Sequence, residues 1–303
     1  MADVIATVWD FDKTLIAGYM QEPLFEKFGV DGKSFWQENE REIDRQKKAG
    51  LDVNRDTFYL NLMLRYTKKG KPFYGLNNDD LKALGQHQKF FEGAIDLFKS
   101  IVSLNEDKIY REYDIKFENY IVSTGLKKII EGSEIAPYVT RVWGAEFIEA
   151  PNEDGRMQIG EVCYSLDNST KTRALFEINK GAWSPDLNID VNTKIPEDLR
   201  RVRFCNMVYV ADGPSDVPAF SLIGQHNGAT LAVYPRGCKE ALHSVEKLRR
   251  DGRVQMLAEA DYRSDSTASM WIMDRLRSQA DDIVSEKKAR LNKLGPGTPR
   301  HMT

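Results

Sequence analysis

Short runs of hydrophobic residues that end in polar side chains recur along the chain, and segments with helical spacing of apolar residues separate them. The runs predict buried strands over residues 4–12, 117–123, 204–211 and 229–233. The helical spacing predicts helices over residues 93–102, 126–131, 170–179 and 217–222. Strands that alternate with helices favour a mostly parallel sheet covered on both faces, which is an α/β, doubly wound fold.

One long segment, residues 17–89, interrupts this alternation. It is charged and aromatic, and Tyr59, Met63 and Tyr66 recur near helical spacing. The segment contains no clear strand pattern. We therefore predict a helical subdomain at 17–89, inserted into a core formed by residues 1–16 and 90–303.

Two further patterns complete the expected core. Residues 139–147 and 157–163 resemble the arms of a hairpin, because Asn152 to Gly155 between them is a turn sequence. Residues 266–286 predict one long helix. The sequence beyond about residue 236 carries no motif from which a function can be read.

The composition excludes some classes of function. With 303 residues, of which 41% are hydrophobic, the chain can bury a substantial core. A formal net charge of −3 argues against a general nucleic-acid-binding surface. No stretch approaches the roughly 20 apolar residues of a membrane span, and the start lacks the features of a secretory signal. We expect a soluble cytoplasmic protein with no nucleic-acid or membrane partner; its oligomeric state stays open.

The first strand ends in two carboxylates, Asp10 and Asp12. Side chains two residues apart on an extended segment point to the same side. When two carboxylates are held close together, their pKa values can differ, so that one is ionised while the other holds a proton. This arrangement suits a nucleophile beside an acid/base. A polar loop after a strand would give the same pattern, so this motif alone does not decide the function.

Other strand ends and helix starts carry further polar groups, namely Ser123 with Thr124, then Lys171, then Asp212 with Asp216. A hydroxyl before a helix suits a phosphate, and a lysine suits a phosphoryl oxygen. Paired carboxylates after a strand suit Mg²⁺, which prefers hard oxygen ligands. Each feature also has an ordinary explanation, respectively a helix cap, a solvated lysine and a turn.

The four features together, in this order, resemble the haloacid dehalogenase superfamily of phosphatases and phosphotransferases, and most of all its phosphoserine phosphatase-like group. The matching residues are Asp10 and Asp12 of the first motif, DxDx[TV], Ser123 of the second, Lys171 of the third, and Asp212 and Asp216 of the fourth. The resemblance implies a Rossmann-like core with a mobile cap, and segment 17–89 occupies the position of that cap.

The resemblance also implies a reaction cycle. Asp10 attacks phosphorus and forms an aspartyl-phosphate, while Asp12 protonates the leaving oxygen and then activates water. The residues implied to hold Mg²⁺ are Asp10, the backbone carbonyl of Asp12, and Asp212, with Asp216 supporting the metal shell or Lys171. The residues implied to bind the phosphoryl oxygens are Ser123, with Thr124, and Lys171.

The substrate is predicted only as a small phosphorylated metabolite. Phosphoserine phosphatases carry a substrate-binding glutamate early in the cap; here Tyr19 lies near that place and Glu22 comes later. Both are candidate specificity residues, and the difference argues against phosphoserine. Lys13 stands where many members have a small residue, and the fourth motif reads DGPSD in place of DGxND.

Several alternatives stay open at this point. A dehalogenase does not need the acid/base that Asp12 supplies, so the presence of Asp12 argues against that activity. A phosphotransferase or phosphomutase would differ only in the acceptor, and a catalytically silent binding protein could share the fold. A dinucleotide-binding protein is excluded because no GxGxxG follows the first strand.

Overall fold

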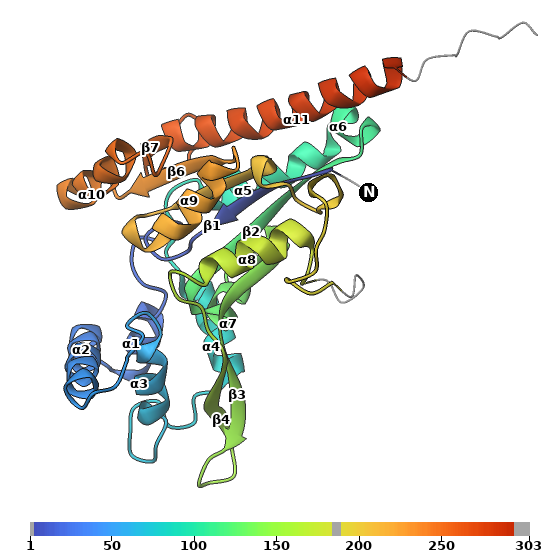
Figure 1. The fold of residues 1–303 in the computed structure, drawn as a ribbon. Coiled ribbons are helices and arrows are strands. Elements are labelled where there is room, and N and C mark those ends of the chain that lie inside the picture. The colour runs from blue at the N-terminus through green and yellow to red at the C-terminus, as the bar shows by residue number, and fades with distance from the viewer. Residues whose placement is uncertain (1–2, 184–188, 294–303) are drawn as a thin grey trace, which may run out of the picture.

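The computed structural model describes residues 3–183 and 189–293, and its centre is a single seven-stranded sheet (Figure 1). The strand order is β4-β3-β2-β1-β5-β6-β7. The strands are β1 (Asp3–Trp9), β2 (Ile115–Leu126), β3 (Arg141–Pro151), β4 (Met157–Tyr164), β5 (Met207–Ala211), β6 (Ala229–Tyr234) and β7 (Met256–Glu259). Neighbouring strands are parallel except for the antiparallel pair β3 and β4. The predicted α/β fold with a mostly parallel sheet is confirmed.

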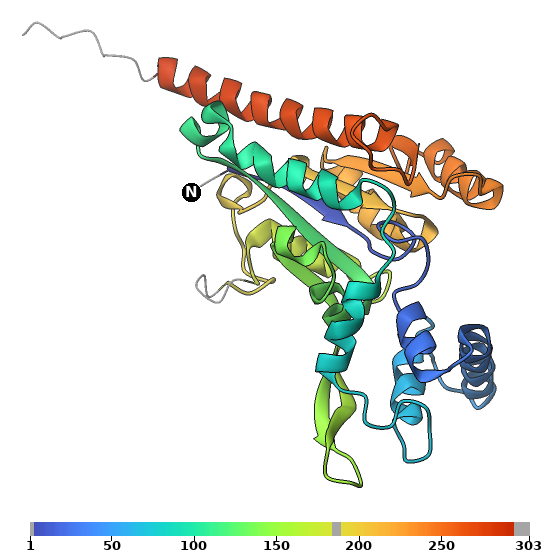
Figure 2. The same ribbon diagram turned by 180° about the vertical axis from the view of Figure 1, so that it is seen from behind.

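Helices lie on both faces of this sheet. The helices are α1 (Glu22–Phe28), α2 (Gly32–Lys48), α3 (Phe58–Tyr66), α4 (Asn78–Leu84), α5 (Ala94–Ser103), α6 (Lys108–Glu112), α7 (Lys127–Glu131), α8 (Lys171–Lys180), α9 (Val217–Gln225), α10 (Lys239–Arg250) and α11 (Thr267–Lys293). Helices α5 and α11 cover one face, as Figure 2 shows, and α8, α9 and α10 cover the other. Within the described part of the chain, none of these helices combines the length and the apolar character needed to cross a membrane.

The core follows from the two-residue period of the strands. In β1, Ile5 and Trp9 pack on the side of α5 and α11, whereas Val4, Ala6 and Val8 pack on the side of α8 and α9. All five side chains are buried. A strand that is apolar on both faces is typical of a parallel sheet covered by helices on both sides.

The structure corrects some of the expected boundaries. Strand β1 ends at Trp9, so Asp10 and Asp12 lie in the loop that follows it. Strand β2 continues through Ser123 to Leu126 with an irregularity after Val122, so α7 begins only at Lys127. The region after residue 236 also contains α10 and β7, and β7 extends the sheet beyond β6.

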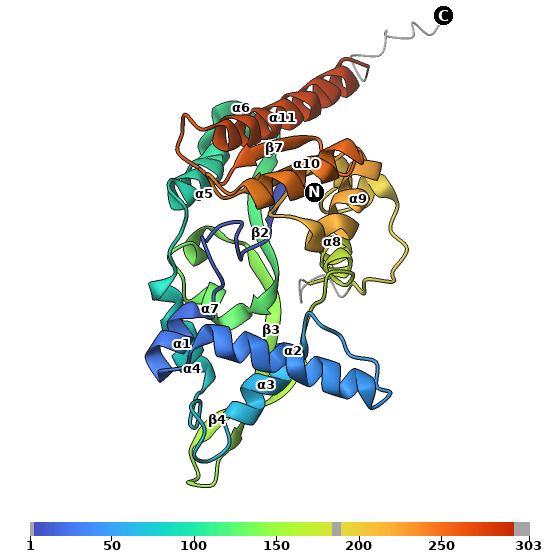
Figure 3. The ribbon, with the colours of Figure 1, turned by 90° about the vertical axis from the view of Figure 1, so that its left-hand side faces the viewer.

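Helices α1 to α4 occupy the segment predicted to be helical, and they lie beyond the end of β1 (Figures 1 and 3). The β3–β4 hairpin packs against this segment: the side-chain amide of Asn78 donates to the carbonyl of Phe147 (3.1 Å), and the backbone N–H of Ile159 donates to the carbonyl of Leu76 (2.8 Å). The helical segment therefore touches residues assigned to the core. The division into a core and a cap stays a prediction.

Candidate active site

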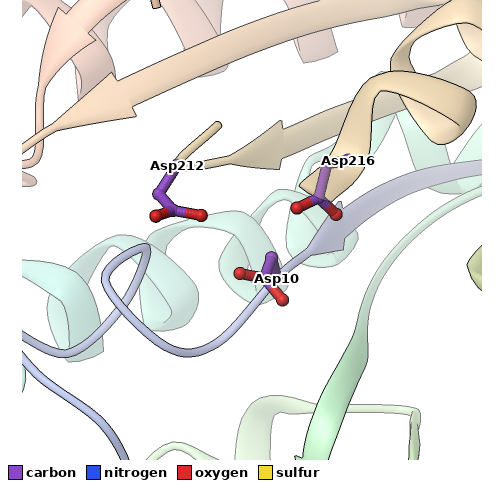
Figure 4. Close-up of side chains that lie close together, drawn as sticks. All are labelled: Asp10, Asp212 and Asp216. Carbon is purple, nitrogen blue, oxygen red and sulfur yellow. The ribbon is translucent and has the colours of Figure 1, made fainter. Parts of the chain in front are cut away.

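Three carboxylates meet at the carboxyl ends of β1 and β5. These strands are parallel neighbours and Trp9 pairs with Val210, so Asp10, directly after Trp9, and Asp212, directly after the last residue of β5, emerge at the same edge of the sheet. Asp216 precedes α9 and points toward the other two (Figure 4). One oxygen from each of the three carboxylates lies within 4.8 Å of the others. The predicted first and fourth motifs are thus brought together.

Lys171 joins two of these carboxylates from the start of α8. Its Nζ lies 2.7 Å from Asp10 Oδ1 and 2.7 Å from Asp216 Oδ1, and the residue is only 2% exposed. Burial opposes the charge of the ammonium, but the two carboxylates outweigh this and raise the pKa of Lys171 above its ordinary value. Lys171 therefore stays positively charged in the site.

Asp216 receives further donors that the sequence interpretation missed. The hydroxyl of Tyr209 donates to its Oδ1, and the hydroxyl of Ser215 donates to its Oδ2 (2.7 Å). Tyr209 lies on the buried strand β5, and a buried tyrosine hydroxyl needs a hydrogen-bond partner. That need was the signal in the sequence that Tyr209 contacts another polar group. Asp216 is thus fully engaged by neighbouring side chains.

Asp12 has a different environment from Asp10. Its Oδ1 accepts the backbone N–H of Met20 at 2.9 Å. Burial, reinforced by the nearby charge of Asp10, raises the pKa of Asp12 to about 8. Burial also raises the pKa of Asp10 to about 6, although Lys171 acts in the opposite direction. In the metal-free site, the two carboxyls therefore differ in their tendency to hold a proton, with Asp12 the better proton donor near neutral pH.

Ser123 lies at the same edge of the sheet, on the neighbouring strand. Trp9 pairs with Ile121, so Ser123, two residues further along β2, lies beside the start of the Asp10 loop. The Ser123 Oγ is buried and accepts the backbone N–H of Gly125 at 3.0 Å, and a hydroxyl that accepts one hydrogen bond can still donate its own hydrogen. Because β2 continues to Leu126, Ser123 is not at a helix N-terminus, and that part of the prediction is wrong. The neighbouring Thr124 carbonyl accepts the hydroxyl of Tyr59 at 2.9 Å.

The two candidate specificity residues differ in their contacts. Tyr19 is 42% exposed, and its hydroxyl accepts a hydrogen bond from Lys13 Nζ at 2.7 Å. Glu22 accepts the backbone N–H of Tyr19 at 3.2 Å through its Oε1, so it supports the local turn before α1. Tyr19 is therefore the more available of the two for a ligand.

No family model matches this chain. An uncharacterized protein of Borreliella burgdorferi is 38% identical over 288 residues, which cover 90% of this chain and 97% of that protein. This chain belongs to the same family as the Borreliella protein.

Solved structures also resemble the chain. One is a HAD family hydrolase of Salmonella enterica serovar Typhi, with a TM-score of 0.47 and 16% identity, covering 79% of this chain and 65% of that one. Another is a phosphoserine phosphatase described as a phospho-aspartyl intermediate analogue, with a TM-score of 0.47 and 14% identity, covering 86% of this chain and 94% of that one.

The carboxylates of the site fit the magnesium ion that the resemblance of the motifs implies. Asp212 is partly exposed, and its carboxylate accepts no hydrogen bond from the residues at 3–183 and 189–293, so its oxygens are free to bind a cation. Burial and the charge of Asp10 raise the pKa of Asp212 to about 7, and a cation would lower it. Because Mg²⁺ takes few protein carboxylates and keeps several waters, Asp10 and Asp212 suffice as anionic ligands. Asp216, held by three donors, is better suited to support Lys171.

Proposed function

We propose that this chain is a Mg²⁺-dependent phosphatase that hydrolyses a small-molecule phosphate monoester through an aspartyl-phosphate on Asp10. The observation that carries the proposal is the environment of Asp10: a buried ammonium at 2.7 Å on one side and the free carboxylate of Asp212 on the other. Phosphoryl transfer depends on positioning and on neutralising spread negative charge, and this arrangement supplies both.

In the first half-reaction, an oxygen of Asp10 attacks phosphorus as the bond from phosphorus to the leaving oxygen breaks. Lys171 orients Asp10 through Oδ1, and Thr14 donates to Oδ2 at 3.3 Å. Asp12 gives its proton to the leaving oxygen, and its raised pKa of about 8 suits that role. A magnesium ion bound by Asp10, Asp212 and the backbone carbonyl of Asp12 would neutralise charge on the phosphoryl group.

In the second half-reaction, water attacks the phosphorus of the aspartyl-phosphate and releases inorganic phosphate. Asp12, now ionised, accepts a proton from that water. The ammonium of Lys171 and the hydroxyl of Ser123, as a donor, stabilise the phosphoryl oxygens throughout the cycle. Dividing the displacement into two steps is the advantage of a covalent intermediate.

The helical segment is proposed to close over this chemistry and to select the substrate. Support comes from contacts of the segment with the motifs, among them Met20 N–H with Asp12, and the Tyr59 hydroxyl with the carbonyl of Thr124. A segment held at these points would exclude bulk water from the aspartyl-phosphate. We expect substitutions in this segment to change substrate ranking.

The proposal is tested by separating the two carboxylates of the first motif. Asp10→Asn should reduce phosphate release from an aryl phosphate to background, because no nucleophile remains. Asp12→Asn should lower turnover by about 10²–10⁴-fold. An aryl leaving group needs little protonation, so this variant should accumulate phosphorylated protein, visible as a mass increase on the peptide that contains Asp10.

The exposed Asp251 serves as the control, since Asp251→Asn should leave turnover unchanged. Phosphate found on Ser123, or substantial turnover by Asp10→Asn, would show that the nucleophile is assigned wrongly. Normal turnover by both variants would remove the phosphatase proposal. Addition of an alcohol acceptor separates hydrolysis from phosphoryl transfer, because a transferase would form a new phosphate ester in place of inorganic phosphate.

A further inference from the structure

Three aromatic side chains of the helical segment form a row, and we call Tyr19, Trp36 and Tyr59 the aromatic row. The ring centroids of Tyr19 and Trp36 are 5.6 Å apart, and those of Trp36 and Tyr59 are 5.7 Å apart. These separations fall in the range of direct aromatic contact. The three rings come from distant parts of the segment, respectively the loop before α1, α2 and α3.

Both ends of the aromatic row are attached to the proposed catalytic motifs. At one end, Lys13 Nζ lies 2.7 Å from the Tyr19 hydroxyl oxygen and 4.2 Å from the centre of the ring, and Lys13 directly follows Asp12. At the other end, the Tyr59 hydroxyl donates to the carbonyl of Thr124, which directly follows Ser123. The row therefore runs from the residue after the acid/base to the residue after the proposed phosphate-binding hydroxyl.

The core of the helical segment accounts for only part of this arrangement. Phe25 and Phe35 pack on Trp36, with centroids 6.3 Å and 5.3 Å away, so one side of the indole is a core contact. Tyr59 is buried as well. Tyr19 is different because 42% of it is exposed, while Lys13 fixes its hydroxyl. An exposed ring held in place beside a reaction centre is suited to contact a ligand.

We propose that Tyr19, supported by Trp36, binds a planar ring in the leaving group of the substrate. The substrate class is then a phosphate monoester of an aromatic or heteroaromatic alcohol. The inference rests on the proposed function. If the phosphoryl group binds between Asp10 and Ser123, the leaving group attached to it lies beside the aromatic row. Tyr59, tied to Thr124, fixes the inner end of the row in relation to that position.

The test compares two substrates that differ in aromaticity and closely match in size and charge: benzyl phosphate and cyclohexylmethyl phosphate. Both release an alkoxide, so both require the same acid. A contact between two aromatic rings is more favourable than burial of the same area alone. We therefore expect kcat/KM for the benzyl ester to exceed that for the cyclohexylmethyl ester by about 2- to 10-fold. Tyr19→Leu should remove this preference by lowering kcat/KM for the benzyl ester alone. Tyr19→Phe, the matched control, keeps the ring and should keep the preference.

Equal kcat/KM for the two esters, or a preference that survives Tyr19→Leu, would overturn the inference. Calorimetric binding of benzylphosphonate and cyclohexylmethylphosphonate, which are not hydrolysed, gives a readout that does not depend on turnover. Tighter binding of benzylphosphonate, lost in Tyr19→Leu, supports the aromatic site even if neither ester releases phosphate, and the proposed function then fails alone. Hydrolysis of both esters without aromatic preference would instead leave the phosphatase and refute the ring-binding role.

Discussion

Replacing Lys171 by Met should destabilise the metal-free protein strongly, because it leaves two buried carboxylates without their shared cation. The ammonium lies 2.7 Å from both Asp10 and Asp216, and Asp216 is completely buried. Removing one partner of a buried ion pair costs about 3–5 kcal/mol of folding free energy. At about 2–4 °C per kcal/mol for a large domain, the melting temperature should fall by roughly 6–20 °C.

The assay is thermal unfolding with a chelator present, repeated with Mg²⁺. Lys27→Met is the matched control, since Lys27 lies 2.8 Å from Asp80 but both side chains are about one-third exposed or more. An exposed pair of this kind contributes about 0–1 kcal/mol. Asp216→Asn should partly rescue Lys171→Met by removing one of the unpaired charges, giving a coupling energy of about 0.5–3 kcal/mol in the double-mutant cycle.

Two results would refute this reasoning. A melting temperature for Lys171→Met within the range of Lys27→Met would show that the buried contacts contribute little. Strict additivity of Lys171→Met and Asp216→Asn would show that the two side chains do not interact as their distance implies. Because Mg²⁺ also neutralises Asp10, its addition should reduce the deficit of Lys171→Met, and a deficit that grows with Mg²⁺ would contradict the proposed ligand set.

Two further predictions concern the same cluster. Chelation should abolish phosphate release and Mg²⁺ should restore it, whereas Ca²⁺ should support turnover poorly because it accepts more ligands in a looser geometry; full activity in excess chelator would contradict this. The metal-free protein should lose stability as the pH rises from about 5 to about 8, because the folded pKa values of Asp10, Asp12 and Asp212 are raised to about 6, 8 and 7. Groups with raised folded pKa values stabilise the fold fully below their unfolded pKa of about 4 and lose that contribution as the pH passes the folded values. Melting temperatures across this range, with and without Mg²⁺, test the direction, and a stability that rises with pH in chelator would show it to be wrong.

The sequence predicted the carboxylate cluster from the four motifs taken together in their order, because an acidic strand end alone also has an ordinary explanation. Asp10 and Asp212 follow buried runs of valine, alanine and aromatic residues, and parallel strands bring such ends to one edge. The lysine of the cluster was harder to predict. Lys171 opens an ordinary amphipathic helix, and only the order of the four motifs distinguishes it from a solvated lysine.

Other features could not be read from the sequence because they depend on long-range packing. The contact between Tyr209 and Asp216 joins a strand to a helix start, and neither residue indicates the other in the sequence. Helix α10 and strand β7 are short elements beyond the last motif, in a stretch where charged residues hide the apolar pattern. The extension of β2 through Ser123 likewise depends on pairing with β3, which sequence patterns alone do not specify.

The turn after Asp12 links the chemistry to the aromatic row. Lys13 adopts a left-handed conformation, with φ of 57°, which costs a residue with a side chain about 1–2 kcal/mol relative to the right-handed region. A glycine would avoid that cost, and many similar motifs have a small residue there. The turn is closed by the backbone N–H of Lys13, which donates to the carbonyl of Gly18 at 3.2 Å, and it returns the chain so that Met20 contacts Asp12. Because the same turn directs the Lys13 ammonium to Tyr19, the side chain that strains the loop also fixes the exposed ring. The position of a residue in the proposed substrate site is thus coupled to the geometry of the proposed acid/base.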